Sequence, residues 1–173
     1  GISHLGTIKT KTVLSLISML KEFPHDYDVL TKEGCVLHQN RTDIVNKAIE
    51  RECTHLLFID SDMVFPKDSA QKLLERGKDV IGVHYNRRKF PPESTIVNPT
   101  DPNQELTTCD SVGTGFMLIK LEVFKNLSHP WFFWDVDEGK TLTGEDYWFC
   151  RKAREAGYEI YADMTLEIKH EGS

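Results

Sequence analysis

Two carboxylates, Asp60 and Asp62, follow the apolar run 56–59 with one residue between them. Four consecutive apolar residues cannot alternate with solvent, so this run is predicted to form a fully buried strand. In an open α/β sheet, ligands bind at the carboxyl ends of the strands, which is where these acids lie. Two hard oxygen donors favour a divalent cation, and the cation in turn indicates a phosphorylated ligand. The alternative is that Asp60 caps the next turn and Asp62 is a solvated loop residue.

Two further groups of polar side chains are candidates for a functional site. Glu145 and Asp146 follow Thr143 and Gly144 at the predicted start of a helix, and His170 follows the last predicted strand. Thr143 and Asp146 have the spacing of a capping box, with Asp in place of the usual Glu or Gln, so helix capping is the alternative for Asp146. A solvated terminal residue is the alternative for His170.

Hydrophobic periodicity predicts the elements that must position these residues. Apolar residues spaced three and four apart indicate amphipathic helices, and short apolar runs indicate strands. The order strand, helix, strand over 56–85 predicts a right-handed crossover and a parallel pair. Prolines and polar residues predict a long loop over 86–108. The predicted helices are 10–21, 41–52, 66–76 and 145–156, and the predicted strands are 28–30, 56–59, 79–85, 116–119, 159–161 and 165–168.

Composition and charge exclude several classes of protein. The chain has 173 residues, 39% of them hydrophobic and 28% charged, as expected for one globular domain spanning 1–173. Its net charge of −6 argues against binding to nucleic acid by phosphate neutralisation, and no apolar run is long enough to span a membrane. The cysteines lack metal-binding spacing, which favours a reducing compartment and a cytoplasmic location. They are Cys35, Cys53, Cys109 and Cys150.

The three groups of polar residues stand in an order that resembles a known family. Segments 34–41 and 111–119, the second with Gly113 and Gly115, resemble two further parts of that family. The resemblance is to the GT-A fold glycosyltransferases, in particular glycosyltransferase family 2, and it covers nearly the whole chain. It implies a single α/β domain with a Rossmann-like, mixed and mainly parallel sheet flanked by helices. The matching motifs are Asp60-Ser61-Asp62, Thr143-Gly144-Glu145-Asp146 and Lys169-His170-Glu171-Gly172.

The resemblance implies roles for residues on the donor side of an active site. Asp62 is expected to bind a divalent metal directly, Asp60 to contact the donor ribose or support the metal, and His170 to be a further metal ligand. Oxygen donors with one imidazole suit Mn²⁺ or Mg²⁺ better than a structural Zn²⁺. The metal would bridge the diphosphate of a nucleotide sugar and neutralise charge on the leaving group. Arg41 is expected to pair with a donor phosphate, or else is a solvated residue of a first helical turn.

The resemblance also implies roles on the acceptor side. Asp146 is expected to be the general base that takes a proton from the acceptor hydroxyl, and Glu145 to bind an acceptor hydroxyl. Gly113 and Gly115 are instead expected on the donor side with Asp60, Asp62 and Arg41, where they would let the backbone approach the sugar, or else they form a bulge or tight turn. The aromatic block 131–134 either stacks on an acceptor sugar or belongs to the core.

The sequence therefore predicts metal-dependent transfer of a sugar, with inversion, from a nucleotide-diphosphate donor to a carbohydrate or other hydroxyl acceptor. The alternatives are a nucleotidyltransferase that forms sugar nucleotides and a non-catalytic carbohydrate-binding protein. Members of the family open with an apolar strand whose end contacts the nucleotide base, whereas segment 1–6 carries no apolar run. We therefore expect the first strand to be missing from the chain.

Overall fold

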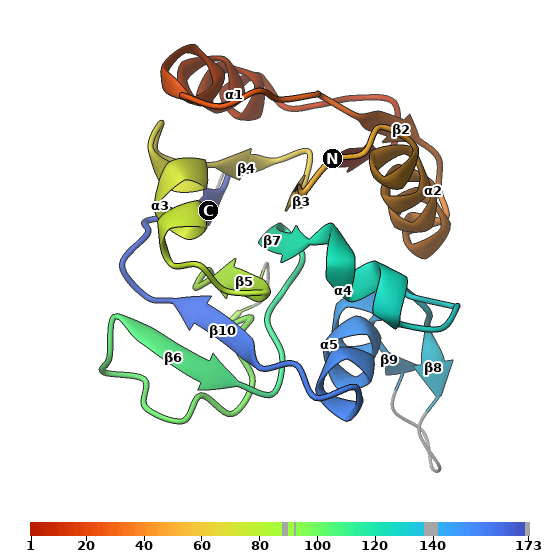
Figure 1. Ribbon diagram of the computed structural model, residues 1–173. Coiled ribbons are helices and arrows are strands. Elements are labelled where there is room, and N and C mark those ends of the chain that lie inside the picture. Colours follow the sequence, from red (N-terminus) through yellow and green to blue (C-terminus); the bar gives the residue numbers. More distant parts are fainter. Residues whose placement is uncertain (88–89, 92, 137–141, 172–173) are drawn as a thin grey trace.

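A five-stranded mixed sheet lies at the centre of the computed structural model, which describes residues 1–87, 90–91, 93–136 and 142–171 (Figure 1). Strands β3, β5 and β10 run in one direction, while β7 and β6 run in the other. The predicted α/β class with a mixed sheet is confirmed, but only one of the four neighbouring strand pairs of the described sheet is parallel, so the pairing is not mainly parallel as predicted. In order across the sheet, the strands are β3 (His55–Ile59), β7 (Phe116–Lys120), β5 (Val80–Val83), β10 (Ile160–Asp163) and β6 (Leu106–Cys109).

The predicted parallel pair of 56–59 and 79–85 was wrong in one respect. β3 and β5 point the same way, but they are not neighbours, because β7 inserts between them and pairs antiparallel with both. The only parallel neighbours in this sheet, among the described residues, are β5 and β10. The order of elements in the sequence indicated the crossover from β3 to β5. It contained no sign that β7, a later strand, would lie between them.

The chain opens with a strand, contrary to the expectation for segment 1–6. β1 (Ile2–His4) pairs in parallel with β2 (Thr31–Glu33), which lies just after the strand predicted at 28–30. The amine of Gly1 donates to the carbonyl of Leu57 at 2.7 Å, so β1 also lies against β3. The prediction failed because Ile2 is the only buried aliphatic residue of β1, too weak a signal for a strand.

Helices cover both faces of the sheet. α1 (Thr10–Glu22) and α3 (Ser69–Glu75) pack on one face, and α2 (Leu37–Glu50), α4 (Leu121–Asn126) and α5 (Glu145–Glu155) pack on the other. Side chains alternate along the central strands because successive residues of a strand point to opposite faces. In β7, Met117 and Ile119 face the layer of α2, α4 and α5, whereas Phe116 and Leu118 face α1 and α3.

Short strands complete the fold around the sheet. β4 (Met63–Val64) pairs antiparallel with β11 (Lys169–His170), and β8 (Asp135–Val136) pairs antiparallel with β9 (Leu142–Thr143). The predicted loop 86–108 overlaps β6 at its end, and the predicted strand 165–168 is not one. No helix in the described part of the chain is long and apolar enough to cross a membrane.

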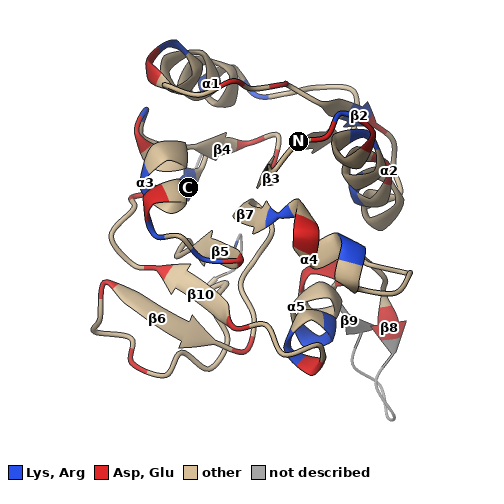
Figure 2. Cartoon of the chain, viewed as in Figure 1, with Lys and Arg blue, Asp and Glu red and all other residues tan. Residues whose placement is uncertain are grey.

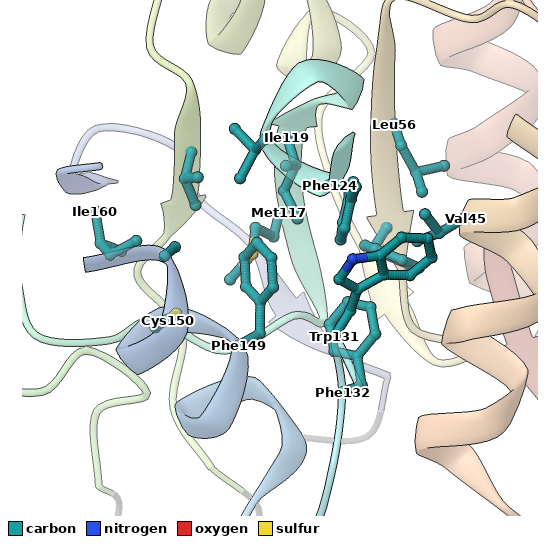
Figure 3. Packing of buried hydrophobic residues seen from close by; sticks show 14 of the residues in the cluster. Val45, Leu56, Met117, Ile119, Phe124, Trp131, Phe132, Phe149, Cys150 and Ile160 are labelled. Atoms are coloured by element: carbon teal, nitrogen blue, oxygen red, sulfur yellow. The ribbon is translucent and has the colours of Figure 1, made fainter. Parts of the chain in front are cut away.

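Aromatic side chains form the centre of the layer that contains α2, α4 and α5 (Figure 3). The ring of Phe132 lies 5.5 Å from that of Phe58 and 5.3 Å from that of Phe149, measured between centroids. The block 131–134 is divided between two environments. Phe132 is 1% exposed and Trp131 is also buried, whereas Phe133 is 43% exposed and Trp134 is similar. The core interpretation therefore holds for the first two residues of the block.

Charged residues lie mainly on the helices and loops, and the central strands are largely uncharged (Figure 2). This distribution is the one expected when both faces of a sheet are covered by helices. Asp60 and Asp62, which follow the carboxyl end of β3, are therefore exceptions to this distribution and are candidates for a functional role.

We predict that Phe132→Ala lowers the free energy of unfolding by about 3–5 kcal/mol, because it leaves a cavity among the stacked rings. Phe133→Ala is the matched control, since it removes a neighbouring ring that is largely exposed, and it should cost about 1 kcal/mol or less. Urea unfolding followed by circular dichroism measures both. Equal losses in the two variants would contradict the packing described here.

Candidate functional site

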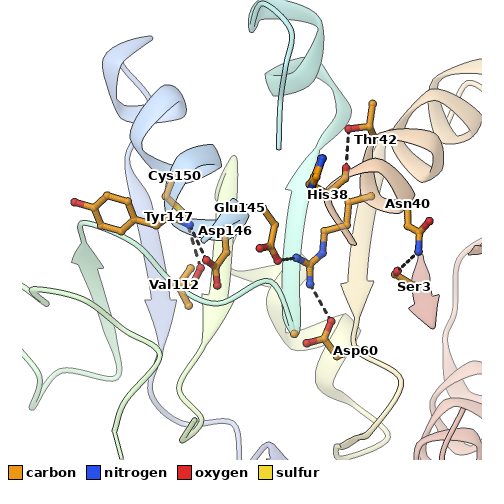
Figure 4. Close-up of polar contacts among 12 residues, drawn as sticks. Ser3, His38, Asn40, Thr42, Asp60, Val112, Glu145, Asp146, Tyr147 and Cys150 are labelled. Atoms are coloured by element: carbon orange, nitrogen blue, oxygen red, sulfur yellow. Dashed lines mark hydrogen bonds and ion pairs between the residues drawn. The ribbon is translucent and has the colours of Figure 1, made fainter. Parts of the chain in front are cut away.

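A buried arginine joins the end of β3 to the start of α5. Arg41, in α2, is 2% exposed, and its Nη2 donates to Oδ1 of Asp60 at 3.0 Å. Its Nη1 donates to Oε1 of Glu145, the first residue of α5. Figure 4 shows Asp60 and Glu145 joined to the same guanidinium group. Two of the three polar groups that the sequence singled out are therefore linked through one side chain.

The charges of this cluster depend on one another. Burial by itself would lower the pKa of Arg41, but the carboxylates of Asp60 and Glu145 outweigh it and raise that pKa. Burial raises the pKa of Glu145, while the adjacent guanidinium opposes that rise. Arg41 therefore links α2 to the end of β3 and to the start of α5. Its contact with a donor phosphate stays a prediction.

Glu145 and Asp146 are adjacent in sequence but lie in different environments. Glu145 is buried against Arg41, whereas Asp146 is half-buried on the first turn of α5. Oδ1 of Asp146 accepts a hydrogen bond from the backbone N–H of Tyr147 at 2.8 Å. The N-cap of α5 is Gly144, so Thr143 and Asp146 do not occupy the N-cap and N3 positions of the capping box that was the alternative for Asp146. Of the two acids, Asp146 is the more accessible to a ligand.

The third polar group lies beside the first. In the ladder of β4 and β11, His170 is paired with Met63. Met63 directly follows Asp62 in the sequence. The backbone N–H of Glu171 donates to the carbonyl oxygen of Asp62 at 2.6 Å, which extends the contact by one residue. The tertiary structure therefore places the last strand against the segment that carries both aspartates.

Tyr85 is a residue of this region that the sequence reasoning missed. It follows β5 and is 6% exposed, and its Oη accepts a hydrogen bond from the N–H of Gly115 at 2.9 Å. Burial, and next the charge of Asp60, raise the pKa of Tyr85, so the phenol stays protonated. The available signal was a polar aromatic residue at the end of a predicted buried strand.

The two predicted glycines make room for this phenol. A Cβ at Gly115 would lie 2.5 Å from Oη of Tyr85, and one at Gly113 would be closer still. A Cβ at Gly115 would also lie 3.0 Å from Oδ2 of Asp60. Close approach of another group thus accounts for both glycines, and a contact of their backbone with a sugar stays a prediction.

The side chains present suit a metal ion that arrives with a phosphorylated ligand. Among the described residues, no group of three or more His, Cys, Asp or Glu side chains is placed to hold a metal by itself. Mg²⁺-type ions in sites that bind phosphates need only one or two carboxylates, with ligand oxygens and water completing the shell. The carboxylate of Asp62, just before β4, and the imidazole of His170, in the paired β11, are donors of the right chemistry for such an ion.

A cavity of about 880 Å³ lies in another part of the molecule. It is bounded by α1 and by β3 as far as Ile59, and Leu16 and Leu56 are among its apolar lining residues. It includes none of the residues that the sequence predicted for a site. This cavity is therefore not lined by the carboxylate cluster that follows β3.

Comparison with solved structures supports the fold. The crystal structure of A197 from STIV matches 98% of this chain and 82% of its own, with 21% identity and a TM-score of 0.68. GalNAc-T7, solved with UDP, GalNAc and Mn²⁺, matches 98% of this chain and 37% of its own, with 12% identity and a TM-score of 0.58. The inositol-1-phosphate CTP transferase from T. maritima, at a TM-score of 0.44 and 12% identity, is too distant to support an argument.

These likenesses bear on the fold alone, because the sequence identities are low. They confirm the predicted GT-A type of α/β fold, which the chain shares with GalNAc-T7 over nearly its whole length. No protein-family model matches the chain. A comparison with curated protein sequences likewise gives no match. Membership of glycosyltransferase family 2 therefore stays a prediction.

We predict that Arg41→Ala lowers the free energy of unfolding by about 3–5 kcal/mol, because Glu145 is left buried without its counterion. Arg51→Ala is the matched control: Arg51 ends the same helix and pairs with Asp28 in an exposed ion pair, which should contribute about 0–1 kcal/mol. Chemical denaturation at pH 7 measures both variants. Similar losses in the two would show that the pairing of Arg41 with Glu145 is not what holds α5 in place.

Proposed function

We propose that this protein is a metal-dependent glycosyltransferase that moves a sugar from a nucleotide-diphosphate donor to a hydroxyl acceptor. The observation that carries the proposal is the arrangement of acids after β3: Asp60 is linked through Arg41 to the start of α5, and Asp62 immediately precedes β4, which pairs with the strand that carries His170. GalNAc-T7, which has a similar fold, was solved with UDP, GalNAc and Mn²⁺. The proposal extends that chemistry to this chain.

On the donor side, Asp62 and His170 are proposed to hold a Mn²⁺ or Mg²⁺ ion. The ion would supply positive charge that stabilises the departing nucleoside diphosphate. Asp60 is proposed to contact the ribose or to support the ion. Its carboxylate keeps a constant orientation because Oδ1 accepts a hydrogen bond from the buried Arg41.

On the acceptor side, Asp146 is proposed to be the general base. Its carboxylate takes the proton of the acceptor hydroxyl, and the acceptor oxygen forms a bond to the anomeric carbon. The bond from that carbon to the diphosphate oxygen breaks, and the nucleoside diphosphate leaves with the electron pair. A single displacement of this kind inverts the anomeric configuration. Asp146 is preferred to Glu145 because Glu145 is buried against Arg41, whereas Asp146 is half-buried.

Asp146→Asn should reduce transfer about 10²–10⁴-fold, because the amide cannot accept the acceptor's proton. Donor binding should be retained, since Asp146 is proposed to act only on the acceptor. Asp43→Asn is a control that removes a carboxylate from an exposed ion pair with Lys32. Full activity in the Asp146 variant would show that this acid is not the base.

Asp62→Asn should abolish the metal-dependent part of donor binding while the thermal unfolding midpoint stays close to that of the wild type. Calorimetric titrations with UDP, GDP, CDP and dTDP, each with and without Mn²⁺, test this and identify the nucleotide. Undiminished Mn²⁺-dependent binding in the variant would remove Asp62 from the metal site.

Product analysis separates the proposed activity from the other two that the sequence left open. A glycosyltransferase releases a nucleoside diphosphate, whereas a nucleotidyltransferase releases pyrophosphate. A carbohydrate-binding protein releases neither, and its sugar binding would be indifferent to nucleotide and metal. The titrations identify which nucleotide binds. Incubating the protein with sugars activated by that nucleotide, and separating the products by chromatography, distinguishes the three activities.

A further inference from the structure

Tyr85 lies at the point where the separate halves of the proposed donor site meet. It follows the end of β5, its hydroxyl contacts the segment that leads into β7, and its ring contacts β11. None of these contacts is local in sequence. We infer that Tyr85 is a positioning residue that sets the placement of Asp60 relative to His170, an inference that rests on the proposed function.

The hydroxyl of Tyr85 acts on Asp60 through a single residue, Gly115. The N–H of Gly115 donates to Oη of Tyr85, and the carbonyl of Gly115 accepts from the N–H of Asp60, both at 2.9 Å. The backbone of Asp60 is therefore bonded to a residue whose own position depends on the phenol. The absence of a side chain at Gly115 permits this approach, since a Cβ there would meet Oη at 2.5 Å.

The ring of Tyr85 acts on His170. The two rings are 5.3 Å apart between centroids and meet edge to face, with an interplanar angle of 83°. The backbone of His170 is held on its other side by the ladder with β4, opposite Met63. Ring contact and ladder together limit the orientations open to the imidazole.

Tyr85 is itself held firmly enough to position others. Its carbonyl oxygen accepts hydrogen bonds from the backbone N–H of Thr95 at 3.1 Å and from Oγ1 of Thr95 at 2.9 Å. Both residues are buried. Tyr85 therefore has two separable roles. Its hydroxyl positions the backbone of Asp60, and its ring limits the orientation of the His170 imidazole.

Tyr85→Phe separates these roles, because it deletes the hydroxyl and keeps the ring. The probe is the nucleoside diphosphate that the wild type binds among UDP, GDP, CDP and dTDP. We expect its Mn²⁺-dependent affinity to fall about tenfold or more in this variant. Nucleotide affinity without Mn²⁺ and the thermal unfolding midpoint should change little. Tyr161→Phe is the matched control, since it deletes a phenol that bonds to the exposed Glu159.

A second pair of variants distinguishes positioning from simple packing. Gly113→Ala places a methyl group against Oη of Tyr85, so it should lower the unfolding midpoint and weaken Mn²⁺-dependent binding. Adding Tyr85→Phe removes the obstructing oxygen. The double variant should therefore regain part of the lost stability, since the new methyl group would still lie close to Cζ of residue 85 and to Cβ of Thr95. It should not regain Mn²⁺-dependent binding, because the hydroxyl that orders Gly115 is still absent.

The outcomes separate this inference from the proposed function. If the wild type binds no nucleotide in a Mn²⁺-dependent way, the proposed function and this inference both fail. If the wild type binds and Tyr85→Phe binds equally well, only the inference fails. Loss of folding in Tyr85→Phe, or recovery of binding together with stability in the double variant, would make Tyr85 a packing residue and also overturn the inference.

Discussion

The burial of Arg41 is the constraint on which the arrangement of this site depends. A guanidinium that is 2% exposed must be neutralised and hydrogen-bonded, because an unpaired charge in that position would cost several kcal/mol. The carboxylates that satisfy it come from the end of β3 and the start of α5. One charge on α2 therefore holds together two segments that are distant in the sequence.

The same ion pair gives two adjacent acids different properties. Glu145 is turned toward Arg41 and buried, and Asp146 is left half-buried on the first turn of α5. Neighbouring carboxylates with distinct surroundings are a common arrangement in active sites, because environment decides which group binds a proton and which supports the structure. In this protein the arginine makes that distinction.

The antiparallel direction of β7 brings glycines to the edge of the sheet where the acids lie. β7 runs against both β3 and β5, so its beginning is level with their ends. Gly113 and Gly115 precede β7, and thus they lie beside Asp60 and Tyr85. A fully parallel sheet would have placed the start of this strand at the opposite edge. The mixed sheet is what allows one glycine residue, Gly115, to link the phenol of Tyr85 to the backbone of Asp60.

Features of the chain that depend on local pattern were predictable from the sequence. The buried strand before Asp60, the amphipathic helices and the α/β class follow from hydrophobic periodicity, which acts over a few residues. The pairing of Arg41 with Glu145, the insertion of β7 and the contacts of Tyr85 were not predictable. Each joins residues far apart in the chain, and short-range spacing contains no information about such contacts. They are decided when the chain packs, because only then does burial require that every charge and polar group find a partner.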